Sequence, residues 1–386
     1  MENFRYYNPT KIIFGKNTIP QIGPVIKKHG FRKILMLAGQ GSIRKNGVYE
    51  QAAKSLKSAG IKSVELWGVR PNPVLAKAKE AIRVAKKNKV EAILAVGGGS
   101  VIDSAKASAA GVFLRDLWDA FEDKVRIEKA LPLFTVLTVS GSASEMNQWA
   151  VVTNEAEKKK WSIGSDALFP RVSIIDPSVQ MSLPWKQTVF GAVDALAHLM
   201  ENYFLGRDQE TSMALAEALM RTIMKLVDKL QHSPEDYDSR ANLVWAAGLA
   251  HSGIAAAAMR GGDWASHGIQ HGVSALHPEL AHGAGLAVIF PAWILQVRKS
   301  NPITFQRWAR NVMQSRNIED AVYKFRTKLA KWRAPVWLSD LGIHAREIKA
   351  IAQNACQQEL GILKKLSRKD VESILKRTHK PTDKIK

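Results

Sequence analysis

The stretch that decides the fold is Val90-Glu-Ala-Ile-Leu-Ala-Val96-Gly97-Gly98-Gly99-Ser100-Val-Ile-Asp103-Ser-Ala-Lys106. Its first seven residues are mostly apolar and predict a buried strand, and the residues after the glycines predict a helix. Consecutive glycines let the backbone approach a ligand closely, and the helix that follows offers free N–H groups and its positive dipole end to an anion. We therefore predict a phosphate-binding turn at the carboxyl end of a parallel strand. A glycine turn without a ligand is the simpler alternative.

Strand-like and helix-like segments alternate on both sides of this turn. Strands are expected at residues 11–15, 33–38, 63–67, 90–96, 131–138 and 172–176, a strand pair at 150–153 and 161–164, and helices at 18–29, 47–59 and 74–88. This alternation predicts a parallel sheet with right-handed helical crossovers. After Pro184 only helices are expected, at 186–205, 208–231, 237–259, 264–277, 284–300, 302–314, 317–333, 345–354 and 367–378. The predicted organisation is an α/β domain over residues 1–180 and an all-helical domain over residues 181–386.

Two further loops could meet an anionic ligand. In Gly39-Gln40-Gly41-Ser42-Ile-Arg44, the third glycine of the dinucleotide fingerprint would have to stand at Arg44, so a standard Rossmann motif is disfavoured. The small residues of Val139-Ser-Gly-Ser142-Ala-Ser-Glu145 offer hydroxyl and N–H groups after another predicted strand.

Histidines are concentrated in His267-Gly-Ile-Gln-His271-Gly-Val-Ser-Ala-Leu-His277-Pro-Glu-Leu-Ala-His282, which holds four of the ten in the chain. His267 and His271 are four residues apart and share a helix face, as do Asp194 and His198 in an apolar run. Imidazole and carboxylate groups are common ligands of divalent metals, and a buried pair of them needs a partner. The two segments together predict a metal site, although any one of these histidines could be an ordinary core residue.

The bulk properties are those of a globular protein with one unusual number, a formal charge of +21. We find no secretory signal and no membrane-spanning run of apolar residues, and the single cysteine, Cys356, fits a cytoplasmic protein. The charge could indicate a nucleic-acid-binding protein. Because the basic residues are spread along the chain without interleaved aromatic residues, we expect neither a nucleic-acid nor a membrane partner.

The ordered set of motifs resembles the iron-containing (group III) alcohol dehydrogenases over nearly the whole chain, and within them the NADPH-dependent butanol dehydrogenase and aldehyde reductase branch. The motifs that carry the resemblance are Asn8-Pro-Thr-Lys-Ile-Ile-Phe-Gly15, Pro71-Asn72-Pro73, Gly97-Gly-Gly-Ser-x-x-Asp103, Thr138 to Glu145, Asp176-Pro177, Asp194-x-x-x-His198 and His267 to His282. The resemblance implies a dinucleotide-binding α/β domain followed by a helical domain, as in dehydroquinate synthase. It also implies hydride transfer between a nicotinamide cofactor and a small aldehyde or primary alcohol, such as butanal or butanol.

The same resemblance implies the site residues. One divalent metal, Fe²⁺ or Zn²⁺, would be held by Asp194, His198, His267 and His282, with His271 beside it as a catalytic proton relay or positioning residue. The cofactor would be bound by Gly39, Gln40, Gly41, Ser42, Asn72, Gly97, Gly98, Gly99, Ser100, Asp103, Thr138, Ser142 and Lys160. NAD-preferring relatives carry an Asp where this chain has Gln40, followed here by Arg44 and Lys45, which favours NADP(H).

Three expectations complete the hypothesis. Asn147 and Trp149, which follow the Ser/Glu loop, are expected to face the substrate. The strand at residues 11–14 could pair across a homodimer. The enzymatic alternative is a metal- and NAD-dependent lyase of the dehydroquinate synthase type, which would need several basic residues around a phosphorylated, carboxylated substrate.

Overall fold

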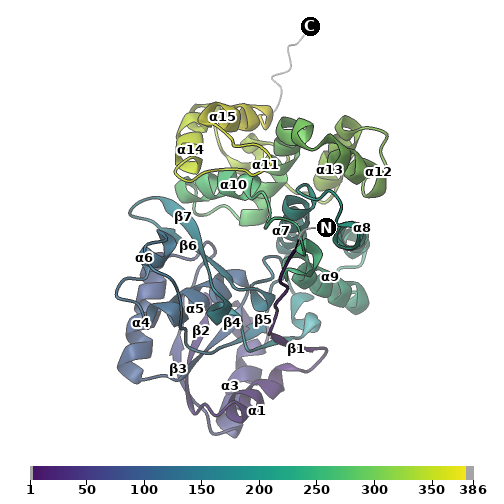
Figure 1. Cartoon of the computed structure of the whole chain (residues 1–386). Coiled ribbons are helices and arrows are strands. Elements are labelled where there is room, and N and C mark those ends of the chain that lie inside the picture. The colour runs from purple at the N-terminus through teal and green to yellow at the C-terminus, as the bar shows by residue number, and fades with distance from the viewer. Residues whose placement is uncertain (1–2, 380–386) are drawn as a thin grey trace. The chain divides into compact units, whose positions relative to one another are not determined.

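The computed structural model describes residues 3–379, which form two compact units (Figure 1). One unit comprises Tyr7–Pro184 and His232–Gly253, and the other comprises Trp185–Gln231 together with the described residues 3–6 and 254–379. The predicted division was a single cut after residue 180. The structure differs from it in placing helix α9 (Tyr237–Ala250) with the α/β unit, because Val244 of α9 is part of that unit's hydrophobic core.

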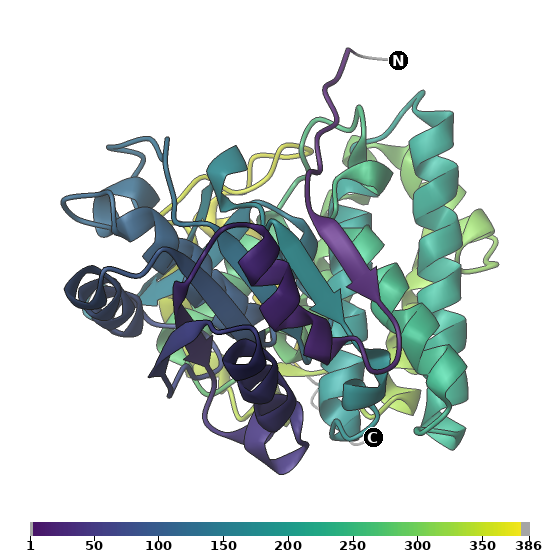
Figure 2. The same ribbon diagram turned by 90° about the horizontal axis from the view of Figure 1, so that it is seen from below.

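The α/β unit is built on six parallel strands in the order β1-β8-β5-β4-β2-β3, which confirms the predicted parallel sheet. The strands are β1 Lys11–Phe14, β2 Lys33–Ala38, β3 Lys62–Leu66, β4 Ala92–Gly97, β5 Leu133–Leu137 and β8 Val172–Ile175. The order places β1 at one edge beside β8 (Figure 2). A homodimer formed through that edge stays a prediction.

Helices cover both faces of this sheet because the strand side chains alternate between them. Ile34 and Met36 of β2 pack in one core with helices α1 and α3, whereas Leu35 and Leu37 of the same strand pack on the other face with α4 and α5. The helices of this unit are α1 Ile22–Lys28, α2 Ser42–Lys45, α3 Val48–Ser58, α4 Leu75–Asn88, α5 Gly99–Gly111 and α6 Trp118–Phe121, besides α9.

The strand order reverses between β2 and β4. From β2 the chain goes out to β3 and returns to add β4 on the other side of β2, with α3 on one face and α4 on the other. Open α/β sheets bind ligands beyond the carboxyl ends of the strands at such a switch point. The glycine segments that follow β2 and β4 therefore lie where a ligand is expected.

A two-stranded hairpin confirms the predicted strand pair. Strands β6 (Trp149–Asn154) and β7 (Lys159–Gly164) are antiparallel, and Ala150 and Val152 of β6 share a core cluster with Ala107 and Ala110 of α5.

The second unit is helical, and no strand follows β8 within residues 3–379. Its helices are α7 Trp185–Tyr203, α8 Glu210–His232, α10 Ala265–Leu276, α11 His282–Val297, α12 Pro302–Asn311, α13 Ile318–Lys331, α14 Ile348–Ala355 and α15 Arg368–Arg377. The helix predicted at 237–259 ends at Ala250 instead, and within the rest of that range Gly253 and Ala258 have positive φ angles that an α-helix does not accept. Over the described residues no helix is both long and apolar enough to cross a bilayer.

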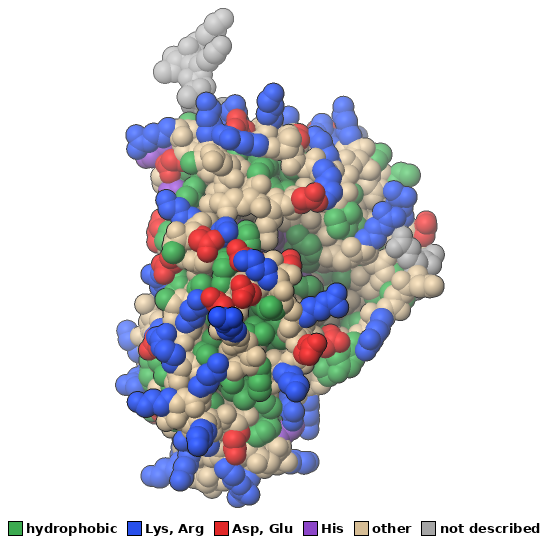
Figure 3. All heavy atoms as spheres, turned by 60° about the vertical axis from the view of Figure 1, so that its left-hand side comes forward, with side chains coloured by type: hydrophobic (Ala, Val, Ile, Leu, Met, Phe, Trp, Pro, Cys, Tyr) green, Lys and Arg blue, Asp and Glu red, His purple; other side chains and the backbone are tan. Residues whose placement is uncertain are grey.

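The basic residues do not gather in one patch on the face drawn in Figure 3. Lys and Arg side chains are spread over it and are interspersed with Asp and Glu. A nucleic-acid interface depends on a basic face or stripe. The expectation that no nucleic acid binds stays a prediction.

Candidate metal centre and nucleotide-binding segments

Helix α7 presents three polar side chains along one face in an otherwise apolar stretch. Asp194, His198 and Glu201 are spaced i, i+4, i+7, which aligns them on a helix. All three are buried, and Glu201 is fully inaccessible to solvent. The first two were predicted as metal ligands, whereas Glu201 was not singled out. Glu201 could have been found from the sequence, because it lies one helical turn beyond His198 on the same face.

Helix α10 provides a second polar face and α11 brings one more histidine to it. His267, Gln270 and Ser274 are spaced i, i+3, i+7 on α10 and are buried, and α11 begins at His282. Helix α11 packs against both α7 and α10. Its close approach to α7 requires Gly283, since a Cβ there would lie 2.1 Å from the carbonyl oxygen of Phe190.

The predicted ligands converge on one carboxylate oxygen. The Nε2 atoms of His282, His198 and His267 lie 3.4, 3.7 and 3.8 Å from Asp194 Oδ1. Ligand atoms of Asp194, His267 and His282 all lie within 4.8 Å of one another, and the ring of His198 stacks on that of His267 with centroids 4.9 Å apart. One carboxylate and three imidazoles in this arrangement suit a divalent transition metal.

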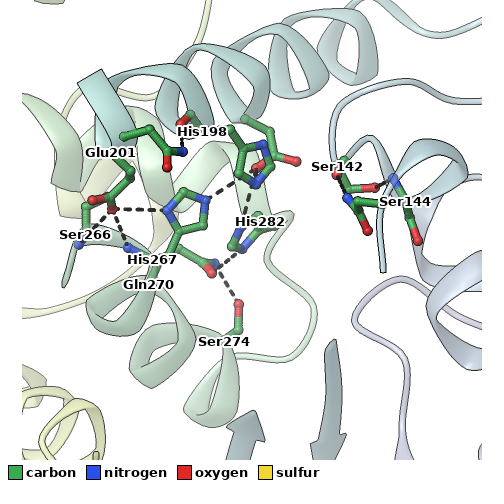
Figure 4. Close-up of polar contacts among 12 residues, drawn as sticks. Ser142, Ser144, His198, Glu201, Ser266, His267, Gln270, Ser274 and His282 are labelled. Atoms are coloured by element: carbon green, nitrogen blue, oxygen red, sulfur yellow. Dashed lines mark hydrogen bonds and ion pairs between the residues drawn. The ribbon is translucent and has the colours of Figure 1, made fainter. Parts of the chain in front are cut away.

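The hydrogen bonds of the Nδ1 atoms decide which nitrogens face the centre (Figure 4). His267 Nδ1 lies 3.1 Å from Glu201 Oε1, and His282 Nδ1 contacts Gln270 Oε1, whose amide nitrogen donates to Ser274 Oγ at 2.7 Å. An imidazole that donates through Nδ1 keeps the Nε2 lone pair for a ligand. The buried Nε2 of His267 has no hydrogen-bond partner among the described residues, which fits a metal as its partner.

The electrostatics of this centre also favour a cation. Burial by itself lowers the pKa of His267, but the neighbouring carboxylates of Asp194 and Glu201 outweigh it and raise that pKa to about 9. The carboxylates thus stabilise a positive charge at this position. A divalent ion provides such a charge.

The other two histidines of the motif have different surroundings. The ring of His271 lies 5.6 Å from that of His282, centroid to centroid, so the predicted relay residue is next to the ligands. His277 places Nε2 2.7 Å from Glu347 Oε1. That contact ties the end of α10 to the turn before α14.

The predicted nucleotide-binding segments follow neighbouring strands of the sheet. Gly39 to Ser42 come after β2, Gly97 to Ser100 run from the last residue of β4 into α5, and Thr138 to Ser142 come after β5. Gly99 allows the turn to approach Ser142, since a Cβ at Gly99 would lie 2.3 Å from the Ser142 hydroxyl oxygen. The structure also brings Asn72 and Lys160 together, with Lys160 Nζ donating to Asn72 Oδ1 at 2.8 Å.

Two predicted residues have contacts that occupy their side chains inside the protein. Asp103 accepts hydrogen bonds from Ser144 Oγ at 2.7 Å and from the backbone N–H of Val151 at 3.1 Å. Asn147 is buried; its Oδ1 accepts from Lys106 Nζ at 3.0 Å, and its Nδ2 donates to the Ser142 carbonyl at 3.1 Å. These contacts give Asn147 a role in holding the loop, whereas the predicted substrate residue Trp149 is 44% exposed.

Lys106 is a buried residue that sequence reasoning missed. Its Nζ donates to Asn147 O, Asn147 Oδ1 and Trp149 O at 2.7, 3.0 and 2.9 Å. Burial lowers the pKa of Lys106 to about 7, against the carboxylates of Asp103 and Glu145, which raise it. Because three donated bonds use all three hydrogens of an ammonium group, we assign Lys106 as protonated. It links the helix after the glycine turn to the loop before β6.

The burial of Glu145 predicts that the stability of the α/β unit depends on pH. The Glu145 side chain is buried, and this burial raises its pKa from 4.5 to about 7, against the opposing effects of its own backbone N–H and of Lys106. The folded chain therefore keeps a proton that the unfolded chain releases. The stability that this group contributes is complete below pH 4.5 and is lost as the pH rises through about 7.

Replacement of Glu145 by Gln is expected to remove this dependence. Glu145→Gln should gain roughly 1–3 kcal/mol over the wild type between about pH 4.5 and about pH 8, because the amide cannot ionise. Denaturant unfolding across that range measures the difference, with exposed Glu128→Gln as the control. Parallel curves for wild type and Glu145→Gln would show that Glu145 does not titrate there.

Comparison with known proteins identifies the family. Residues 9–177 match the model of the iron-containing alcohol dehydrogenases, and residues 188–379 match that of the C-terminal part of the Fe-containing alcohol dehydrogenase family. The crystal structure of NADH-dependent butanol dehydrogenase A from Thermotoga maritima is 51% identical, covers 98% of this chain and 99% of its own, and superposes with a TM-score of 0.96.

Curated relatives agree on the family and differ in the cofactor that they name. Probable NADH-dependent butanol dehydrogenase 1 of Bacillus subtilis is 36% identical over 97% of this chain and 99% of its own length. NADPH-dependent aldehyde reductase YqhD of Escherichia coli is 32% identical over 91% of this chain and 92% of its own length. The predicted preference for NADP(H) is therefore not settled by these relatives. The chain belongs to the iron-containing alcohol dehydrogenase family, and it is an alcohol dehydrogenase or aldehyde reductase that uses a nicotinamide cofactor and a divalent metal.

Proposed function

We propose that this enzyme reduces small aldehydes such as butanal with NADPH and oxidises the corresponding primary alcohols with NADP⁺. In the reducing direction, aldehyde, NADPH and one proton give alcohol and NADP⁺. The observation that carries the proposal is the convergence of three Nε2 atoms on Asp194 Oδ1, at 3.4 to 3.8 Å. Relatives named as butanol dehydrogenases and an aldehyde reductase support the substrate class.

Different residues of the chain would bind the metal, bind the cofactor and transfer the proton. Asp194, His198, His267 and His282 would hold the metal, Fe²⁺ or Zn²⁺, and the segment from Gly97 to Ser100 would bind the cofactor pyrophosphate. When bound, the metal would supply Lewis acidity towards the substrate oxygen, and the cofactor would supply or accept the hydride. His271, beside His282, would pass the proton between the substrate oxygen and water.

An aromatic side chain beside the metal ligands supports an apolar substrate. The ring of Trp264 meets those of His198 and His267 edge-on, with centroids 5.9 and 5.2 Å apart. Trp264 has φ 58°, a backbone conformation that bulky residues rarely adopt, and Asp263 supports it by accepting from the next backbone N–H, that of Ala265. An apolar indole next to the metal ligands favours a substrate with an alkyl chain over one with a charged group.

The residues after β2 support a preference for NADPH. Gln40 is neutral and exposed, so it does not repel a 2′-phosphate, and the guanidinium of Arg44 lies 4.3 Å from the ring centre of Trp67 and 5.1 Å from that of Tyr49. Stacking on two rings restrains Arg44 near the predicted nucleotide segment, where a guanidinium could pair with a phosphate.

Replacement of Arg44 by Ala is expected to weaken NADPH binding roughly 10- to 150-fold, because a charge-assisted hydrogen bond is worth about 1.5–3 kcal/mol. NADH, which lacks the 2′-phosphate, should bind the variant as it binds the wild type. Fluorescence titration of the two cofactors measures both affinities. Exposed Arg83→Ala serves as a control for the loss of one surface charge. Equal losses for the two cofactors would show that Arg44 does not select between them.

The function is tested by following NADPH and, separately, NADH oxidation with butanal, using metal-free protein before and after anaerobic addition of Fe(II) or Zn(II). Metal-restored turnover that is faster with NADPH is the expected result. Turnover with NADH only would overturn the cofactor preference, and no reduction of any aldehyde with either metal would overturn the proposed reaction.

A further inference from the structure

Glu201 occupies an unusual position between two helices of the metal centre. It is on α7, seven residues after Asp194, and its side chain is fully buried. Its Oε1 faces the first turn of α10, where it accepts from Ser266 Oγ at 2.5 Å, the backbone N–H of Ser266 at 3.2 Å and that of His267 at 3.4 Å. It also contacts His267 Nδ1 at 3.1 Å. The same oxygen thus accepts hydrogen bonds from the N-terminus of α10 and contacts the ring of a predicted metal ligand.

A carboxylate in such a place needs a compensating charge. The free N–H groups of the α10 terminus and its dipole stabilise it in part, as in a helix cap. The second oxygen, Oε2, is buried without a hydrogen-bond partner among the described residues. A capping serine or asparagine would satisfy the same N–H groups without the cost of burying a charge. The helix terminus alone therefore does not explain why the residue is an acid.

The sum of the charges at the metal centre explains why residue 201 is an acid. Asp194 and Glu201 bring two negative charges, and the three imidazoles would be neutral when each binds a metal through a nitrogen lone pair. A divalent ion then leaves the group with no net charge. A third buried carboxyl, that of Asp263, lies nearby. It accepts hydrogen bonds from the backbone N–H groups of Ile362 and Leu363, both at 2.7 Å, and of Ala265 at 3.3 Å.

We infer that Glu201 is a positioning residue of the metal centre: it fixes the ring and tautomer of His267 so that Nε2 faces the metal, and its charge strengthens the binding of a divalent ion. The inference rests on the proposed function for the metal ligands. His282 is oriented in a parallel way by Gln270, but through a neutral amide. Of the two ligands His267 and His282, only His267 therefore has a charged partner at Nδ1 among the described residues.

Metal binding tests this inference without reference to turnover. The affinity of the metal-free protein for Co(II) and Zn(II) is measured by competition with a chromophoric chelator, and the visible spectrum of the Co(II) form reports the ligand field. Glu201→Gln keeps the volume and an oxygen that can accept from His267 Nδ1, so it removes only the charge. It should weaken metal binding about tenfold, and Glu201→Ala up to about 100-fold, each with a changed Co(II) spectrum.

Glu217→Gln is the matched control. Glu217 is another buried glutamate of the same unit, bonded to Tyr203, Arg307 and Asn311 instead of a histidine. Its variant should bind metal with wild-type affinity and spectrum. A glutamate that only capped α10 would lower the thermal midpoint in Glu201→Gln and leave the metal affinity and spectrum unchanged, which would overturn the inference. Should Glu201→Ala not fold, the isosteric Glu201→Gln carries the test.

Failure of this inference is distinguishable from failure of the proposed function. If the wild type binds metal and reduces butanal while Glu201→Gln binds metal equally well, only the role of Glu201 is wrong. If the wild type binds metal and Glu201→Gln binds it more weakly, the role of Glu201 stands even where no aldehyde is reduced.

Discussion

His267→Ala is expected to lose the metal and the activity together. The substitution removes one of three imidazoles around Asp194 Oδ1 and leaves the buried carboxylates of Asp194 and Glu201 without the group between them. Turnover should fall by at least about 100-fold, since even the loss of an outer partner of a ligand costs 10–100-fold. Elemental analysis of the purified protein and the rate of cofactor oxidation with butanal measure the two losses. Asp194→Ala should behave in the same way.

His277→Ala is the matched control for this prediction. It removes the same type of residue from the same motif, but His277 contacts Glu347 instead of Asp194. The variant should keep its metal and most of its turnover. A His267→Ala protein that retains metal and turns over normally would contradict the assignment of the centre.

Gly97→Ala is expected to have the largest effect on cofactor binding. A Cβ at this position would lie 2.5 Å from Cγ2 and 2.8 Å from Cβ of Val101, a stiff β-branched residue on the first turn of α5. The helix start must move away from β4, at a cost of about 1–3 kcal/mol, and the N–H groups that the phosphate would meet move with it. Affinity for NADPH and NADH should therefore fall by about tenfold or more, measured by fluorescence titration.

A second substitution separates this mechanism from general damage. Val101→Ala removes the two methyl groups nearest to the new side chain, so Gly97→Ala/Val101→Ala should recover part of the lost affinity. Val101→Ala alone should bind the cofactor nearly as the wild type does. If the double variant binds no better than Gly97→Ala, the clash with the Val101 methyl groups is not the cause.

Spacing in the sequence predicts some of the metal ligands but not all of them. The i, i+4 spacing of Asp194 and His198 placed them on one helix face, and the structure confirms that face within α7. Spacing alone also grouped His271 with His267. Only the family resemblance selected His282 instead, and in the structure it is the Nε2 of His282 that lies 3.4 Å from Asp194 Oδ1. That contact depends on how α11 packs on α7 through Gly283, a feature that no local pattern contains.

The sequence by itself determined the parallel sheet, the glycine turn after β4 and nearly all the helices, because these follow from periodicity and turn residues within short windows. The tertiary structure decided that α9 joins the core of the α/β unit, that Lys106 holds the Asn147 loop, and that Glu201 lies against His267. These contacts join residues far apart in the chain, and each depends on burial of a charge or of an apolar face. Burial is a property of the packed elements, so their spacing along the sequence could not reveal it.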